Sequence, residues 1–121
     1  MTMNKVILTG RMAREPELKI TAAGVPVCRF SVAVEQRRKS NEANKTNQAD
    51  FFPVVCFYGT AEFIKKYFEK GQAVTLYGSL QNRAWEEADG TRRHVTEILA
   101  QEAYFCGRKH TDKRETIEEA R

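Results

Sequence analysis

The 121-residue sequence contains little cysteine, little proline and no long hydrophobic run. Its three cysteines, Cys28, Cys56 and Cys106, are far apart and never form a CxxC pair, which argues against a disulfide framework and a zinc site. No segment approaches the roughly 20 apolar residues of a membrane-spanning helix, and charges interrupt the N-terminal segment where a signal peptide would lie. We therefore expect a cytoplasmic protein with no metal, no cofactor and no membrane partner.

Motifs of catalysis are also missing. The sequence contains no GxxxxGK[ST], no GxGxxG and no HExxH. The two histidines, His94 and His110, have no cysteine or carboxylate pattern of a metal site around them. Glu86 and Glu87 are adjacent in a predicted hairpin, where neighbouring side chains point apart. We therefore expect no enzymatic activity.

Length and charge limit the remaining possibilities. A chain of 121 residues suits one small domain, which we expect over residues 1–106. Residues 107–121 contain a single large apolar residue, Ile117, and are expected to form a polar, mobile tail. The net charge of +4 and the sequence pI of about 9.1 are compatible with a polyanionic partner, although such an excess alone does not establish one.

The order of predicted elements indicates an all-β fold with one helix. A helix is predicted over residues 61–70, where Phe63, Ile64, Tyr67 and Phe68 form an apolar stripe suited to a core. Extended segments are predicted at residues 4–12 (resuming at 18–21 after a break at Glu15–Glu17), 25–36, 50–58, 72–85 and 92–105. Five strands with a helix between strands 3 and 4 predict an oligonucleotide/oligosaccharide-binding (OB-fold) barrel.

The strand at residues 72–85 carries two different faces. Val74, Leu76 and Leu80 share one parity and are predicted to face the core. The opposite parity carries Tyr77, Ser79, Gln81, Arg83 and Trp85, the sole tryptophan. A large aromatic ring beside arginine on the non-core side of a strand lowers solubility unless another molecule packs on it. A nucleic-acid base that stacks on the ring is one such molecule. A tryptophan in the core or in a subunit interface is the alternative, and we expect subunit contact rather than DNA at Tyr77.

Five runs stand in order along the chain: NKVILTGRMAREPELK at residues 4–19, CRFSVAVE at 28–35, DFFPVVCF at 50–57, AEFIKKYFEKGQAVTLYGSLQNRAW at 61–85 and GTRRHVTEILA at 90–100. Together they span about residues 3–106 and resemble the bacterial single-stranded DNA-binding protein family. The resemblance implies a homotetramer of OB-fold barrels that binds single-stranded DNA without sequence preference. It implies roles in DNA replication, recombination and repair, a nucleoid-associated location and no catalytic activity.

The resemblance also implies a set of contact residues. Trp85 matches a base-stacking tryptophan, and Phe51 and Phe57 match aromatic positions that contact DNA. Lys5 and Arg83 match basic positions near the path of the strand.

The residues themselves add further candidates and leave some choices open. One of Phe51 and Phe52 must face inward, and we expect Phe51 to face outward, whereas Phe57 and Tyr58 are equal candidates. Basic side chains that could contact phosphates or merely be solvated are Arg29, Arg92 and Arg93 on strands, and Arg37, Arg38 and Lys39 in the long polar loop of residues 37–48.

Two departures from the family pattern leave an alternative function open. Where some members carry a third stacking tryptophan, this chain reads Gln36-Arg37-Arg38-Lys39. The chain ends in TIEEAR rather than in the acidic, Phe-terminated tip that recruits replication and repair enzymes in well-known members, so the resemblance does not extend to recruitment by that route. A protein-interaction adaptor on the same barrel, with DNA contact secondary, is therefore the alternative hypothesis.

Overall fold

The structure, a computed structural model, describes residues 1–36 and 48–106. The predicted loop at residues 37–48, except Gln48, and the predicted tail at 107–121 lie outside these ranges. The elements are β1 (Val6–Met12), β2 (Glu17–Ile20), β3 (Pro26–Glu35), β4 (Ala49–Phe57), α1 (Tyr58–Tyr67), β5 (Ala73–Glu86) and β6 (Arg92–Phe105). Within the described residues, no helix is long and apolar enough to cross a membrane.

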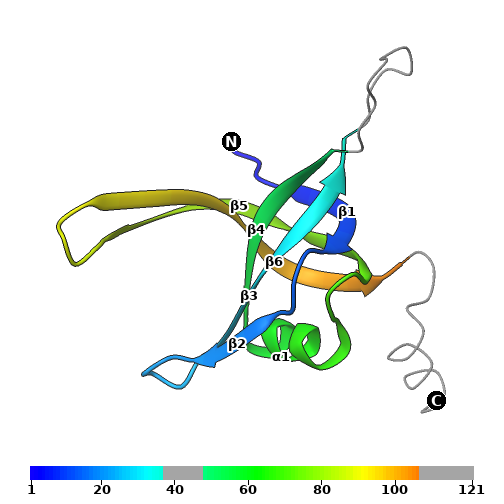
Figure 1. Ribbon diagram of the computed structural model, residues 1–121, viewed down its shortest axis with the longest axis horizontal. Coiled ribbons are helices and arrows are strands. Elements are labelled where there is room, and N and C mark those ends of the chain that lie inside the picture. The colour runs from blue at the N-terminus through cyan, green and yellow to red at the C-terminus, as the bar shows by residue number, and fades with distance from the viewer. Residues whose placement is uncertain (37–47, 107–121) are drawn as a thin grey trace.

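The strands form one sheet that closes on itself into a barrel. The strand order is β1-β5-β6-β4-β3-β2, and β1 also pairs with β3 at Arg11–Ala33 and Met12–Val32. All pairings are antiparallel except the short parallel contact between β4 and β6. Figure 1 shows α1 at one end of this barrel and the distal parts of β5 and β6 reaching away from it. The predicted OB-fold barrel is confirmed, and the described residues contain one helix.

The structure counts one strand more than the prediction. The break at Glu15–Glu17 separates β1 from β2, because Pro16 is buried there and the chain changes direction to pair β2 with β3. The helix consequently lies between β4 and β5 rather than between strands 3 and 4.

The barrel interior is filled by alternate residues of the strands and by one side of the helix. Cys28, Phe30 and Val32 on β3 are buried as their alternation predicts. Ile64 and Phe68 complete this core from the helical side, and Phe68 stacks on Phe105 of β6 with ring centroids 4.8 Å apart. The helical stripe is therefore core packing, as its spacing indicates.

The helix begins and ends three residues earlier than predicted. It starts directly after β4 at Tyr58, and it stops at Tyr67 because the chain must return to β1. Gly71, with φ of +90°, donates its N–H to the Met12 carbonyl, and Met12 donates to the Gln72 carbonyl. Gly71 is thus the turn that joins the helix to β5, not the end of the helix itself.

One core prediction is wrong, at Leu80. Its parity matches Val74 and Leu76, but Leu80 is exposed whereas the other two are buried. The reason is that β1 pairs with β5 only from Ala73 to Gly78, so β5 is part of the barrel wall only over those residues. Beyond that point the side chain of Asn4 bonds both the N–H and the carbonyl of Leu80, and β5 leaves the barrel with β6 as a two-stranded arm.

Tyr58 carries local backbone strain. It begins the helix with φ of +56°, a left-handed conformation that costs a residue with a Cβ about 1–2 kcal/mol. Its side chain is 61% exposed, so little packing offsets that cost. We expect Tyr58→Gly to be about 1 kcal/mol more stable than Tyr58→Ala in urea unfolding, because both variants lose the ring but only glycine loses the Cβ. Equal stability of the two variants would contradict this reading of the turn.

Candidate nucleic-acid interface

The strand register gathers two aromatic side chains on one outer surface of the barrel. On β4, Phe51 and Phe57 share a parity that points away from the core, and they lie opposite Ala33 and Val27 of β3. Phe51 is 63% exposed and Phe57 is half-buried. Phe52, which points the other way, packs against the core. The predicted outward orientation of Phe51 is confirmed, and Phe57 lies on the same side.

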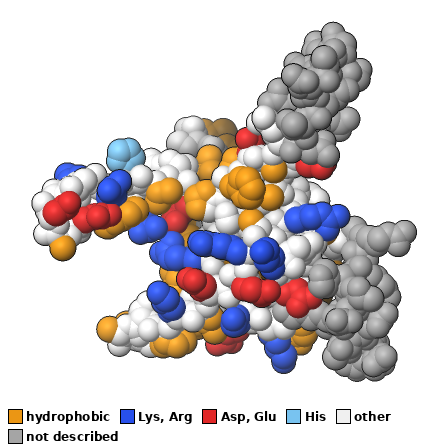
Figure 2. Space-filling model, viewed as in Figure 1, with side chains coloured by type: hydrophobic (Ala, Val, Ile, Leu, Met, Phe, Trp, Pro, Cys, Tyr) orange, Lys and Arg blue, Asp and Glu red, His pale blue; other side chains and the backbone are white. Residues whose placement is uncertain are grey.

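The same surface continues across the sheet to the arm. Val55 lies opposite Arg29 of β3 and opposite Leu99 of β6, and residues paired across a sheet point to the same side. From Leu99 the register with β5 carries this side outward through Gln81, Arg83 and Trp85. We call the surface that bears Phe51, Phe57, Arg29, Arg83 and Trp85 the aromatic face. In the view of Figure 2, Lys and Arg side chains gather over the middle of the molecule, at the foot of the arm.

Trp85 lies on the aromatic face near the end of β5. Its side chain is 39% exposed, and the guanidinium carbon of Arg83 lies 4.6 Å from the centre of its ring. A guanidinium at that distance is held by a cation–π attraction, which covers part of one ring face and restricts the ring. The core alternative for Trp85 is therefore wrong for this chain, because the indole is in contact with solvent.

A buried carboxylate lies beneath the arginines of this face. Glu97 on β6 is 2% exposed. Its Oε1 accepts a hydrogen bond from Nη1 of Arg29 at 3.1 Å, and its Oε2 accepts from Nε of Arg83 at 3.1 Å and from Nε2 of Gln81 at 2.9 Å. The side chains of Arg29 and Arg83 are 43% and 38% exposed, so each is bonded to Glu97 and also in contact with solvent.

Glu97, which holds the two arginines, is an ionised carboxylate. Burial alone would raise the pKa of Glu97, and it is the largest single influence. The hydrogen bonds from Gln81 and Arg83, with the positive charges of Arg83 and Arg29, together outweigh it and hold the pKa of Glu97 below its usual range. Glu97 is thus charged at neutral pH, and it offsets one of the two arginine charges.

The remaining predicted contact residues lie in several places. Arg93 is opposite Trp85, so it shares the side of the aromatic face, and its Nε pairs with Glu87 at 3.1 Å. Arg92 is opposite Glu86 and points to the other side of the arm. Lys5 lies over the Tyr77 ring at 5.4 Å, against the part of β5 that β1 covers. The predicted contacts Arg37, Arg38 and Lys39 lie outside the described residues.

Sequence reasoning missed Glu97. Reading β6 back from Phe105 and Ala103, which pack on the core, strict alternation places residue 97 inside the barrel. A bulge reverses this: Tyr77 pairs with Glu102 but Gly78 pairs with Ala100, so that Gln101 is an extra residue. The sequence did contain one signal. Glu97 is a carboxylate at a position where alternation predicts an apolar core side chain.

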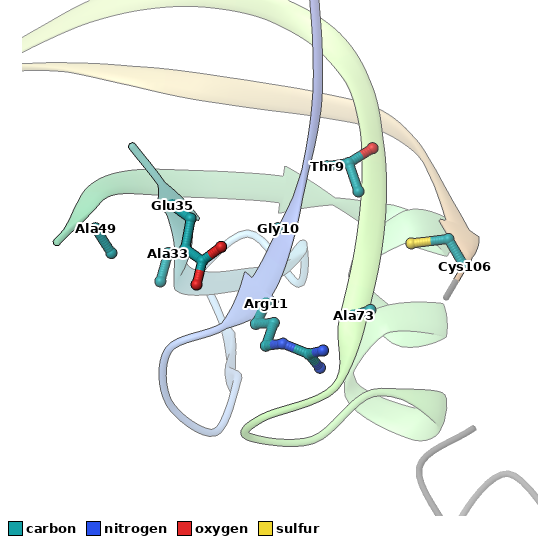
Figure 3. A pocket seen from close by; sticks show the side chains of 8 residues that line it. All are labelled: Thr9, Gly10, Arg11, Ala33, Glu35, Ala49, Ala73 and Cys106. Carbon is teal, nitrogen blue, oxygen red and sulfur yellow. The ribbon is translucent and has the colours of Figure 1, made fainter. Parts of the chain in front are cut away.

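A separate hollow opens where β1 and β3 diverge. It encloses about 470 Å³ and is lined by residues of four strands and by Cys106. Figure 3 shows Glu35 and Ala49 at one end, Cys106 at the other, and Arg11 between them. The thiol of Cys106 is half-buried there, whereas Cys28 and Cys56 are buried in the core. The hollow shares no lining residue with the aromatic face.

Comparison with known proteins agrees with the fold. The model of the single-strand binding protein family matches residues 3–106. "Single-stranded DNA-binding protein 3" of Clostridium acetobutylicum is 42% identical over 104 residues, 85% of this chain and 70% of that protein. The single-stranded DNA-binding protein of Thermotoga maritima is 36% identical over 116 residues, 96% of this chain and 82% of that protein. A solved structure, the Plasmodium falciparum SSB in complex with single-stranded DNA, superposes with a TM-score of 0.74 at 28% identity, covering 88% of this chain and 97% of that one.

Proposed function

The chain belongs to the single-strand binding protein family, and on that premise we propose that it binds single-stranded DNA along its aromatic face. Bases stack on Phe51, Phe57 and Trp85, while Arg29, Arg83 and Arg93 meet the phosphates. Every base has a π-face, so stacking tolerates any sequence, and each stacked base contributes roughly 1–3 kcal/mol. The single observation that supports this best is the register that brings three rings and three arginines to one side of the sheet.

Such binding would cover and protect single-stranded DNA during replication, recombination and repair. It needs no reaction at the site, and we propose no catalytic role. We also propose a nucleoid-associated place in the cytoplasm, because the relatives from Clostridium and Thermotoga are named single-stranded DNA-binding proteins. The loop residues Arg37, Arg38 and Lys39 stay predicted phosphate contacts.

Fluorescence of the sole tryptophan tests this function directly. Titration with oligo-dT at low salt is expected to quench Trp85 emission strongly, because a base stacked on the indole replaces water at its exposed face. Raising the salt concentration is expected to weaken the binding, because phosphates that pair with arginines release counterions. Unchanged emission together with no affinity in low salt would overturn the proposal.

We propose further that the chain assembles as a homotetramer through β1. On this strand Ile7 is 72% exposed, and the register places it opposite Tyr77 of β5. Within the described residues, β1 from Val6 to Thr9 is paired only with β5, which leaves its other edge open to a strand of a second chain. The hollow where β1 and β3 diverge lies along this edge. An exposed apolar side chain beside an open edge suits contact with another copy.

The assembly is tested by replacing Ile7. Analytical ultracentrifugation of the wild type is expected to give four chains of 13.9 kDa, about 56 kDa in total. Ile7→Glu is expected to give a smaller species, because it places a charge in the apolar contact. Ile20→Glu, at an isoleucine on β2 that is 62% exposed, is the matched control and is expected to stay a tetramer. A wild-type protein that sediments as a monomer at micromolar concentration would contradict the proposal.

A further inference from the structure

We infer that Glu97 is a positioning residue for DNA binding, which holds Arg83 so that Arg83 in turn holds the stacking ring of Trp85. This inference rests on the proposed function and names how its site is organised. The contacts form a chain: Glu97 bonds Nε of Arg83, and the guanidinium of Arg83 lies over the indole of Trp85. Glu97 itself is too deeply buried to meet DNA.

Charge and hydrogen bonding explain why a carboxylate suits this position. A neutral side chain would attract two guanidinium groups more weakly than a carboxylate, whose two charged oxygens here bind Arg29 on β3 and Arg83 on β5. The two arginines come from strands that are not neighbours in the sheet, and Glu97 on β6 joins them. The bond from Arg83 uses its Nε, and its two terminal nitrogens carry four more N–H donors for a ligand.

The arrangement divides binding into two parts with opposite responses to Glu97. An oriented indole favours stacking, since less side-chain freedom is lost when a base arrives. A negative charge beneath two arginines lowers the number of phosphates that they neutralise, since only one of the two positive charges remains uncompensated. Loss of the Glu97 charge therefore weakens the stacking part and strengthens the ionic part.

The test measures oligo-dT affinity across a range of salt concentrations for Glu97→Gln, which keeps the shape and removes the charge. Its salt slope is expected to be steeper than that of the wild type by about 0.7, the value for one more phosphate on a single strand. Its affinity extrapolated to 1 M salt is expected to fall about tenfold. Glu62→Gln makes the same charge change on the exposed side of α1 and is expected to match the wild type in both.

A second variant separates position from charge and covers a failure of Glu97→Gln to fold. Arg83→Lys keeps the charge but loses the planar group over Trp85, so the affinity at 1 M salt is expected to fall while the salt slope stays unchanged. In the absence of DNA, acrylamide is expected to quench Trp85 more strongly in both variants, because the ring loses its cover.

The outcomes distinguish this inference from the proposed function. If the wild type binds oligo-dT but Glu97→Gln shows the wild-type slope and the wild-type affinity at 1 M salt, the positioning role is overturned while DNA binding stands. If the wild type does not bind, DNA binding fails, and the acrylamide measurement still decides whether Glu97 and Arg83 order Trp85. Unchanged acrylamide quenching in Arg83→Lys also overturns the inference.

Discussion

Replacing both Phe51 and Trp85 by alanine is expected to weaken binding to oligo-dT by about thirtyfold or more. Each ring offers one stacking surface, and each stacked base contributes roughly 1–3 kcal/mol, so the two together supply about 2–6 kcal/mol. Every 1.4 kcal/mol is a factor of about ten in the dissociation constant. Because the variant lacks tryptophan, the measurement is fluorescence anisotropy of a labelled oligo-dT.

The salt dependence of the same variant shows whether stacking is what was lost. Alanine removes no charge, so the salt slope is expected to match the wild type while the whole line shifts to weaker binding. Leu80→Ala is the matched control, since it removes an exposed apolar side chain from the opposite side of β5 and is expected to leave affinity unchanged. Wild-type affinity in the double variant would refute stacking and favour the adaptor hypothesis.

Gly78→Ala is expected to lower the free energy of unfolding by about 3 kcal/mol, the largest stability effect that we predict. A Cβ at this position would lie 2.0 Å from the carbonyl oxygen of Leu99 and 2.9 Å from its carbonyl carbon. These are backbone atoms of β6, so no side-chain rotation relieves the overlap, and the strands must separate at the bulge. Urea unfolding followed by circular dichroism gives the difference directly.

Gly59→Ala is the matched control for that experiment. Gly59 lies in the first turn of α1, and a Cβ there would meet no atom within 4 Å. Alanine favours helix over glycine by up to about 1 kcal/mol, so this variant is expected to be as stable as the wild type or slightly more so. A Gly78→Ala protein that unfolds at the wild-type urea concentration would contradict the close approach of β5 and β6.

The barrel and its main aromatic residues could be predicted because each depends on local alternation. Cys28, Phe30 and Val32 repeat every second residue with polar neighbours between them, and this pattern fixes which side of β3 is buried. The same rule requires that one of Phe51 and Phe52 face inward, and the structure packs Phe52 against the core. The contact roles that the family resemblance implies for its five matched residues stay predictions: Phe51, Phe57, Trp85, Lys5 and Arg83.

Leu80 and Glu97 could not be placed by alternation, because their environment is set by distant parts of the chain. The side of β5 that carries Leu80 faces the core only where β1 pairs with β5. The length of that pairing cannot be read from the sequence of β5 alone. The side of β6 that carries Glu97 depends on one extra residue, Gln101, whose carbonyl accepts a hydrogen bond from the Thr60 hydroxyl. Leu80 and Glu97 both lie near the point where β5 and β6 leave the barrel, so the alternation typical of a barrel strand no longer applies there.

The helix boundary has a similar origin. Tyr58 is a poor residue for a left-handed conformation, so no sequence rule places a helix start there. In the structure the helix begins at Tyr58, directly after β4 ends at Phe57, opposite Val27 of β3.

A structure of the protein bound to a short oligo-dT tests the central claim most directly. We predict successive bases stacked on Phe51, Phe57 and Trp85, with phosphates near Arg29 and Arg83, while Glu97 stays buried beneath them. A complex in which the strand follows another surface and leaves these three rings uncovered would contradict the account.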